Sequence, residues 1–272
     1  MTITGDLFEA HLKCPLKCWF KARGETGTGN IYFEWVEKRA MAHRAKGIER
    51  LFATTSETQR AISPQKEALK TAKWRLATDA SVSSGNAESC LHAVERIPSE
   101  SRGKPVRFIP VRFVFANKPA KDDKLLLGFD ALALSKSLGR KISLGKIVHG
   151  NDFSTANVKT PALIAAAQRK VEEITAMLAG AAPPDLALNR HCAECEFQKR
   201  CCEKAIEIED LSLLAGMSPK ERAKLQRRGI FSVIQLAYTF RPRRRPKCMR
   251  HKAEKYHHAL KALAIRKRKS TS

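Results

Sequence analysis

Residues 191–202 read HCAECEFQKRCC and contain four of the chain's eight cysteines. Three of them, Cys192, Cys195 and Cys201, follow the spacing C-x2-C-x5-C, which places several thiols within reach of one metal centre. In a reducing compartment, clustered cysteines are more often metal ligands than disulfides. A four-coordinate site built on these three residues still needs one ligand from elsewhere in the chain.

Two further cysteines, Cys14 and Cys18, lie near the N-terminus in HLKCPLKCWF. Because the two ends of a domain often meet in space, either can complete a C-terminal site. A 4Fe-4S cluster would take four thiolates from Cys14, Cys192, Cys195 and Cys201. Zinc would suit the paired set Cys14, Cys18, Cys192 and Cys195. Spacing alone leaves both chemistries open.

The charge of the chain is unusual for a globular protein. Its 272 residues hold 51 Lys and Arg against 27 Asp and Glu, which gives 51 − 27 = +24. Such a charge favours a polyanionic partner, since binding to phosphates releases condensed counterions. The sequence has neither an apolar run of membrane-spanning length nor the layout of a signal peptide, so we expect a cytoplasmic protein with no membrane partner.

The hydrophobic pattern up to about residue 180 predicts an α/β domain. The order of elements indicates a mixed sheet flanked by helices. We expect helices at 32–52, 63–74, 124–139 and 160–180, and strands at 74–82, 88–97, 106–116 and 141–150.

The C-terminal part of the chain has a different character. Ser218 with Glu221, and Ser232 with Gln235, form two capping boxes, which predicts a helical hairpin over residues 207–240. Residues 241–272 form a basic, partly helical tail with thirteen Lys and Arg against one acid, or 13 − 1 = +12. Half of the net charge therefore lies in this tail, which favours contact with nucleic acid.

The cysteine motifs KCPLKCW and CAECEFQKRC resemble those of the iron–sulfur branch of the RecB-like PD-(D/E)XK nucleases. This branch includes CRISPR-associated exonucleases and the nuclease domains of helicase–nuclease repair enzymes. The similarity extends over about residues 7–205 and includes GNIYFEWVEKRAMAHRAKGIERL and KLLLGFDALALSKSLGRKISLGKIVHG. It implies a restriction-endonuclease-like core in residues 1–206.

The resemblance also implies a cofactor and a following module. Cys14 would be the fourth ligand of a structural 4Fe-4S cluster, with zinc as the alternative. Residues 207–240 resemble the helix-hairpin-helix of a group of bacterial RecB-like proteins. Because members of that group are longer, we expect this chain to be an N-terminal portion that lacks a further domain or works with a partner.

The catalytic motif of this family is degraded here. Hydrolysis of a phosphodiester by Mg²⁺ or Mn²⁺ needs converging carboxylates and a basic group near the attacking water. The family places an Asp on one strand and Glu-x-Lys on the next. The matching segments offer His92 and Glu95, and then Pro110, Val111 and Arg112. Arg112 keeps the positive charge of the family's lysine, but Pro110 stands where the family has the glutamate.

Three groups could compensate in a metal-dependent exonuclease. Glu95 could bind metal from a shifted position, with Arg112 as the basic partner. His43 could replace the family's helical histidine, and Asp122 or Asp123 could approach from the next segment. The altered motifs favour loss of cleavage over its retention, and the sequence leaves enzymatic activity open.

The hairpin loop and the basic tail are candidates for nucleic-acid binding, and we expect DNA rather than RNA as the partner. In the hairpin loop, backbone N–H groups near a helix N-terminus can bind phosphate. The candidate contacts are Gly216, Ser218, Lys220, Arg222, Arg241, Arg243, Arg244, Arg245 and Lys247. Three hypotheses follow: a DNA nuclease, a non-catalytic nucleic-acid-binding protein on a degenerate nuclease fold, or a zinc-stabilised protein-interaction domain.

Overall fold

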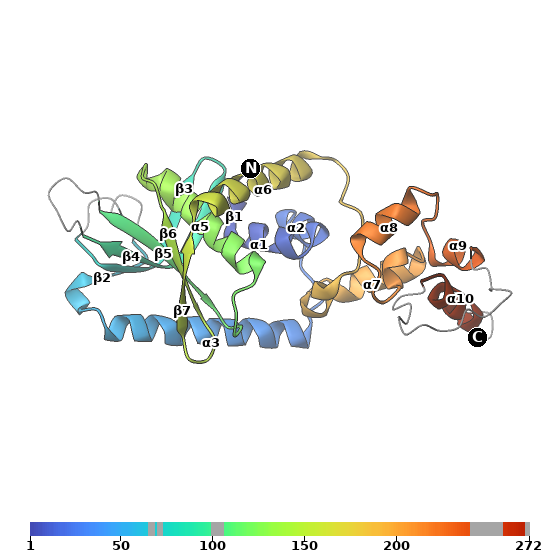
Figure 1. Cartoon of the computed structure of the whole chain (residues 1–272), viewed down its shortest axis with the longest axis horizontal. Coiled ribbons are helices and arrows are strands. Elements are labelled where there is room, and N and C mark those ends of the chain that lie inside the picture. Colours follow the sequence, from blue (N-terminus) through green and yellow to red (C-terminus); the bar gives the residue numbers. More distant parts are fainter. Residues whose placement is uncertain (65–68, 70–72, 99–105, 240–257, 270–272) are drawn as a thin grey trace, which may run out of the picture. The chain divides into compact units, whose positions relative to one another are not determined.

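The computed structural model describes residues 1–64, 69, 73–98, 106–239 and 258–269. The chain forms two compact units (Figure 1). Unit 1 contains Met1–Thr26 and Ile31–Pro184, and unit 2 contains Gly27–Asn30 and Asp185–Ser272. None of the helices in these described ranges is both long and apolar enough to cross a membrane.

Unit 1 is built on a seven-stranded mixed sheet of order β2-β3-β4-β5-β6-β7, with β1 paired to β4. Strands β3 to β5 form an antiparallel meander, β5 and β6 are parallel, and β6 and β7 are antiparallel. The strands are Ile3–Thr4 (β1), Arg60–Ile62 (β2), Leu76–Ser84 (β3), Ala87–Ile97 (β4), Arg107–Val114 (β5), Leu144–His149 (β6) and Ser154–Lys159 (β7). The predicted mixed sheet is confirmed.

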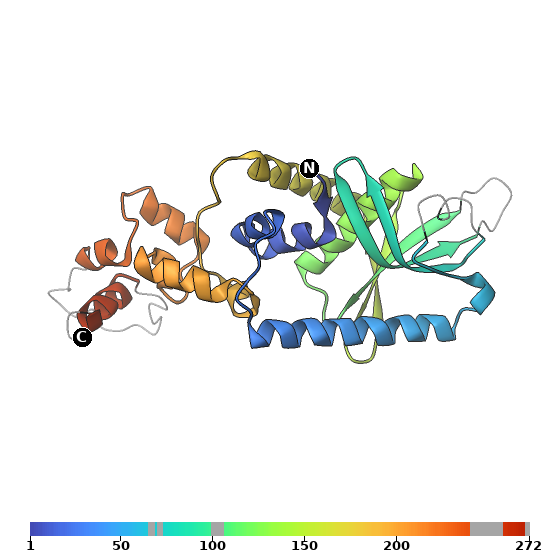
Figure 2. The ribbon, with the colours of Figure 1, turned by 180° about the vertical axis from the view of Figure 1, so that it is seen from behind.

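Helix α5 (Lys121–Leu138) connects the parallel strands β5 and β6 and packs on one face of the sheet. It begins where Asp123 accepts the N–H of Ala120 at 2.7 Å, and it ends at Gly139, whose φ of 63° is left-handed. Helices α1 (Gly5–Lys13) and α6 (Pro161–Ala179) cover its outer side, as both ribbon views show (Figures 1 and 2). Helix α5 is therefore buried on most sides.

Helix α3 (Ile31–Ala53) covers the other face of the sheet (Figure 2). Its residues Ile48, Leu51 and Phe52 pack against Phe113 and its neighbours on the sheet. Gly47 permits this close approach, because a Cβ there would lie 2.3 Å from the Phe113 ring. The described part of unit 1 also contains the short elements α2 (Pro15–Ala22) and η1 (Glu57–Gln59).

Unit 2 is a small helical unit with its own apolar core. Its elements are η2 (Arg190–Glu194), α7 (Gln198–Glu207), η3 (Leu211–Leu213), α8 (Pro219–Gln226), α9 (Val233–Tyr238) and α10 (His258–Lys269). Leu211, Leu214, Val233 and Leu236 are buried together with Ala262 of α10. The end of the chain therefore contributes to the core of the hairpin that precedes it.

The long elements agree with the sequence expectations. The helices predicted at 32–52, 124–139 and 160–180 and the strands predicted at 74–82, 88–97, 106–116 and 141–150 are confirmed. Both capping boxes form, with Ser218 Oγ accepting the Glu221 N–H and Ser232 Oγ accepting the Gln235 N–H, each at 3.2 Å. The helix expected at 63–74 lies mostly outside the described residues.

Candidate functional site

Arg112 lies on β5 at the centre of the sheet, and its guanidinium is buried against α5. Its Nε donates to Asp130 Oδ2 at 2.9 Å, and its Nη2 donates to Asp130 Oδ1 at 3.1 Å. Ser89 on β4 donates to the same carboxylate at 2.6 Å. Arg112 is 9% exposed and Asp130 is 1% exposed, so this is a buried two-pronged ion pair.

Other charges act on this pair. Burial would lower the pKa of Arg112, but the carboxylate of Asp130 and the negative charges of Glu9 and Asp123 raise it. Burial raises the pKa of Asp123, although the hydrogen bond from Ala120 and the charge of Arg112 oppose that shift. Acidic groups therefore surround Arg112, and Asp130 occupies both prongs of its fork. The guanidinium of Arg112 is therefore a structural group that links β5 to α5 through Asp130.

Glu95 has a different partner. It lies on β4 opposite Leu76 and Ile109, and its carboxylate accepts a hydrogen bond from Lys146 Nζ of β6 at 2.6 Å. Both side chains are partly buried. Glu95 thus forms a cross-strand ion pair over β5 and does not share the Arg112 network.

His43 is buried between α3 and the turn that joins β6 to β7. Its Nε2 lies 2.9 Å from the carbonyl oxygen of Gly150, and its ring stacks on Phe153 with centroids 4.5 Å apart. Since a carbonyl can only accept, Nε2 carries the proton. Its Nδ1 is buried with no hydrogen-bond partner among the described residues. These contacts give His43 a structural role in holding the turn.

His92 lies on β4, three residues before Glu95. Its Nδ1 accepts the backbone N–H of Phe113 at 3.2 Å. Burial lowers the pKa of His92 well below its ordinary value, and the positive charges of Arg112 and Arg44 lower it further. The imidazole is therefore neutral and completes the pairing of β4 with β5. Arg44 itself is ion-paired with Asp79.

The three expected catalytic residues thus make separate interactions. Glu95 pairs with Lys146, Arg112 with Asp130, and His43 with the Gly150 carbonyl. In the part of the chain that the structure describes, no three His, Cys, Asp or Glu side chains are grouped to hold a metal ion. Sequence reasoning did not identify Asp130, although an acid inside the apolar run LLLGFDALAL was a usable signal.

The C-terminal cysteines lie near the start of the long segment of unit 2. Cys192 lies in η2, Cys195 follows it directly, and Cys201 lies in α7. The side chain of Asn189 accepts the N–H of His191 at 2.8 Å, and the Asn189 N–H donates to Cys192 Sγ at 3.2 Å. An N–H group directed at a cysteine sulfur is an interaction that also supports metal-bound thiolates.

A short N-terminal segment packs on this cysteine loop as part of unit 2. Asn30 Nδ2 donates to the Ala193 carbonyl at 3.0 Å and to Gln198 Oε1 at 2.7 Å. Gly27 approaches so closely that a Cβ would lie 2.5 Å from the Glu196 carbonyl oxygen. From sequence, residues 24–30 are only a glycine-rich turn. In the fold, the last four of them belong to the cysteine unit.

The N-terminal cysteines belong to unit 1. Cys14 is a partly exposed residue between α1 and α2, in extended backbone conformation. Cys18 is fully buried in the core that α1, α5 and α6 share. Burial and the neighbouring Cys14 raise the pKa of the Cys18 thiol to about 12. Cys18 is therefore a core residue, and Cys14 is the accessible member of the pair.

The hairpin loop of unit 2 has several of its polar groups engaged. The N–H of Ser218 donates to Glu221 Oε2 at 2.8 Å, and Lys261 of α10 donates to the Ala215 carbonyl at 2.8 Å. Gly216 has a left-handed φ of 85°. Lys220 is exposed beside the loop. Of the expected phosphate contacts in this loop, Lys220 is the most accessible charge.

Arg222 points into unit 2. Its Nη2 donates to Asp210 Oδ2 at 2.7 Å and to the Leu186 carbonyl at 2.8 Å, and its side chain is 14% exposed. This contact connects the segment before the cysteines to the hairpin. The expected tail contacts Arg241, Arg243, Arg244, Arg245 and Lys247 lie outside the described residues.

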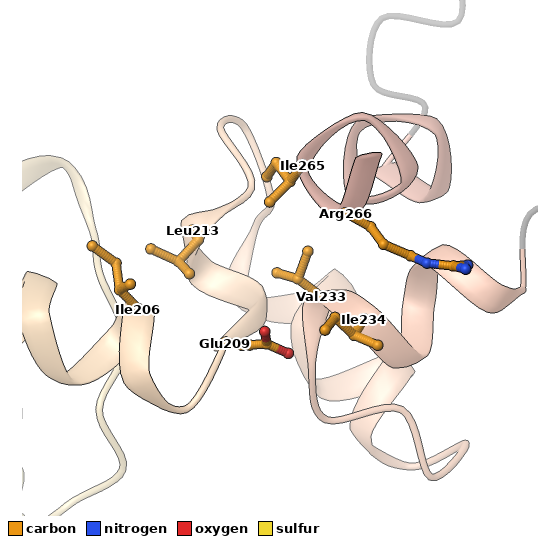
Figure 3. A pocket seen from close by; sticks show the side chains of 7 residues that line it. All are labelled: Ile206, Glu209, Leu213, Val233, Ile234, Ile265 and Arg266. Carbon is orange, nitrogen blue, oxygen red and sulfur yellow. The ribbon is translucent and has the colours of Figure 1, made fainter. Parts of the chain in front are cut away.

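Unit 2 also contains a pocket of about 240 Å³ (Figure 3). Its walls are mostly aliphatic, with one acid and one base. The lining residues are Ile206, Glu209, Leu213, Val233, Ile234, Ile265 and Arg266. An aliphatic wall does not suit phosphates, so the pocket is not part of the candidate interface.

Comparison with known proteins gives little further information. No family model matches this chain, and no curated protein matches it. Among solved structures, the crystal structure of SSO0001 aligns with 60% of this chain and 96% of its own at 14% identity. The TM-score of 0.31 is too low for that likeness to support an argument.

Proposed function

We propose that this protein binds nucleic acid, DNA in the first place, on a RecB-like nuclease fold that no longer cleaves it. The order of helices and strands in unit 1 and the two cysteine motifs support the ancestry. A cytoplasmic location is part of this proposal, because a compartment that keeps thiols reduced leaves the cysteines available as ligands. Binding without cleavage is a function that a retained fold can serve after its catalytic groups are lost.

One observation carries the proposal: the buried network of Arg112, Asp130 and Ser89. Arg112 stands where the resemblance places the catalytic lysine. A catalytic cation must face the attacking water and the scissile phosphate. Here Asp130 accepts two hydrogen bonds from the guanidinium, and the carboxylate of Glu95 is ion-paired with Lys146. These groups stabilise the fold.

The charge distribution supports binding. The net charge is +24, and residues 241–272 hold half of it. Contacts between cations and phosphates give affinity without sequence preference, and they make the affinity fall steeply with salt. We therefore expect tight binding at low salt, with little distinction between sequences. Fluorescence anisotropy of labelled oligonucleotides across a salt series tests this; salt-independent or undetectable binding would refute the proposal.

We further propose a structural 4Fe-4S cluster held by Cys14, Cys192, Cys195 and Cys201. The donor chemistry supports this assignment: Cys192 accepts an N–H hydrogen bond, Cys14 is accessible, and Cys18 is committed to the apolar core. Among the described residues these thiols are not grouped around one point, so the proposal requires them to converge when the cluster binds. The chain enters unit 2 at Gly27, 27 − 14 = 13 residues after Cys14. When bound, the cluster would supply a covalent link between the two cysteine segments and no catalysis.

Anaerobically purified protein is expected to be brown, with iron, sulfide and broad absorbance in the visible blue. Cys201→Ser should abolish this absorbance, while the adjacent Cys202→Ser should keep it. Cys201→Ser and Cys18→Ala together distinguish the cluster from zinc. Only the cluster uses Cys201, and only the zinc set uses Cys18. Colourless protein with stoichiometric zinc, lost in Cys18→Ala and retained in Cys201→Ser, would contradict the cluster.

A further inference from the structure

The N-terminal half of α3 exposes aromatic side chains. Tyr32 and Trp35 are each 48% exposed, and their rings stack with centroids 5.8 Å apart and an interplanar angle of 16°. Most large aromatic side chains in a soluble domain bury their area or contact a partner. This stacked pair lies on the surface of unit 1 although the same helix has a buried face elsewhere.

Cations follow these aromatics along the helix. The guanidinium of Arg39 lies 4.8 Å from the Trp35 ring centroid and 4.3 Å from that of Phe115. About three turns further on, Arg50 lies over the Phe153 ring at 4.1 Å. Both guanidinium groups lie within cation–π distance of a ring, and Arg50 Nη1 also donates to the Asp152 carbonyl at 3.1 Å. A ring therefore accompanies each of the two arginines on this surface.

These residues form one stripe of the helix. Tyr32, Trp35, Arg39, Ala42, Lys46 and Arg50 recur every three or four residues, so we call them the α3 stripe. The stripe lies beside the buried face of α3, which includes His43 and Gly47. At about 100° per residue, the acids Glu34 and Glu37 fall on other sides of the helix. Glu49 falls about 20° from Ala42, at the edge of the α3 stripe. The stripe itself therefore holds two rings and three positive charges, with one acid beside it.

We propose that the α3 stripe is a stacking surface for single-stranded nucleic acid. This proposal rests on the function proposed above and names one binding surface for it. Unpaired bases stack on exposed aromatic rings, and cations along the same line contact the phosphates. A duplex keeps its bases stacked on each other, so it cannot use Tyr32 and Trp35 in this way. An acidic protein partner would use the charges but gain nothing specific from the stacked pair.

Intrinsic fluorescence reports this surface directly. The chain has three tryptophans, of which Trp19 and Trp74 are each 4% exposed, while Trp35 is 48% exposed. Addition of oligothymidylate is expected to quench the fluorescence of Trp35 by stacking. The quenching should disappear in Trp35→Phe, while most of the affinity remains because phenylalanine still offers a ring.

Trp35→Ala is expected to weaken binding of a single-stranded oligonucleotide by roughly 5- to 150-fold, the usual range for loss of one stacked base. Affinity for a duplex of the same length should change less than twofold. Arg39→Ala should lower the salt slope of single-strand binding by about 0.7. Met41, which is 67% exposed on another side of α3, gives the matched control Met41→Ala, which should have no effect.

The outcomes separate this inference from the proposed function. If wild-type protein binds no nucleic acid, the proposed function is wrong. If it binds single strands normally while Trp35→Ala binds equally well and fluorescence is unchanged, the α3 stripe is not the surface. Equal losses for single strand and duplex would also overturn the stacking assignment. Binding of an acidic polypeptide with the same Trp35 dependence would replace nucleic acid with a protein partner.

Discussion

Asp130→Ala is expected to lower the free energy of unfolding of unit 1 by about 3–5 kcal/mol. The substitution removes both acceptors from Arg112 and leaves a charged guanidinium in the interior. It also removes the acceptor of the Ser89 hydroxyl. All three tryptophans lie in unit 1, so urea denaturation followed by tryptophan fluorescence measures this unit.

The double variant Arg112→Met with Asp130→Leu is the matched control. A buried ion pair costs desolvation, and apolar residues of similar volume often replace it at no net loss. The double variant should therefore unfold within about 1 kcal/mol of the wild type. Nucleic-acid affinity should also be unchanged. If Asp130→Ala is as stable as the wild type, or if the double variant loses binding, the network is not the structural group described above.

Neutralising the tail is expected to have the largest effect on affinity. The five substitutions Arg241→Gln, Arg243→Gln, Arg244→Gln, Arg245→Gln and Lys247→Gln remove five charges that we assign to phosphate contacts. Each phosphate contact contributes about 0.9 to the salt slope on duplex DNA, so the slope should fall by about four to five units. At about 0.15 M salt this corresponds to a loss of affinity of roughly 10³- to 10⁴-fold.

Deletion of residues 241–272 would be a poor version of this test. It would remove α10, whose Ala262 is fully buried in the core of unit 2. A matched control instead neutralises five exposed lysines elsewhere in the chain. These are Lys118, Lys121, Lys141, Lys159 and Lys199. The two variants lose equal charge, so equal losses of affinity would show that only net charge matters and that the tail holds no contact site.

The sequence predicts the long elements of this fold well, for a clear physical reason. Each bears a strong local signal, such as the apolar pattern of α5 and the glycine that ends it. Strands β1, β2 and β7 escaped prediction. Two of them have three residues or fewer, and β7 is mostly exposed and polar. Strands of this kind depend on pairing with neighbours, which local sequence does not encode.

The site is less predictable because its partners are distant in sequence. Cysteine spacing identifies a candidate cofactor segment, since ligand spacing is local. Arg222 looks like a phosphate contact from its neighbours, but Asp210 and the Leu186 carbonyl turn it inward. Likewise, the sequence suggests a catalytic role for Arg112, but in the fold its guanidinium is ion-paired with Asp130. Whether a charge is free for function depends on tertiary contacts.

One measurement tests the central claim most directly. Labelled single-stranded and duplex DNA are incubated with the full chain and Mg²⁺ or Mn²⁺, and each sample is split between a native gel and a denaturing gel. The account predicts shifted bands on the native gel and full-length DNA on the denaturing gel. Fragments that exceed a metal-free blank and vanish in Glu95→Ala would contradict it and show that the nuclease is active.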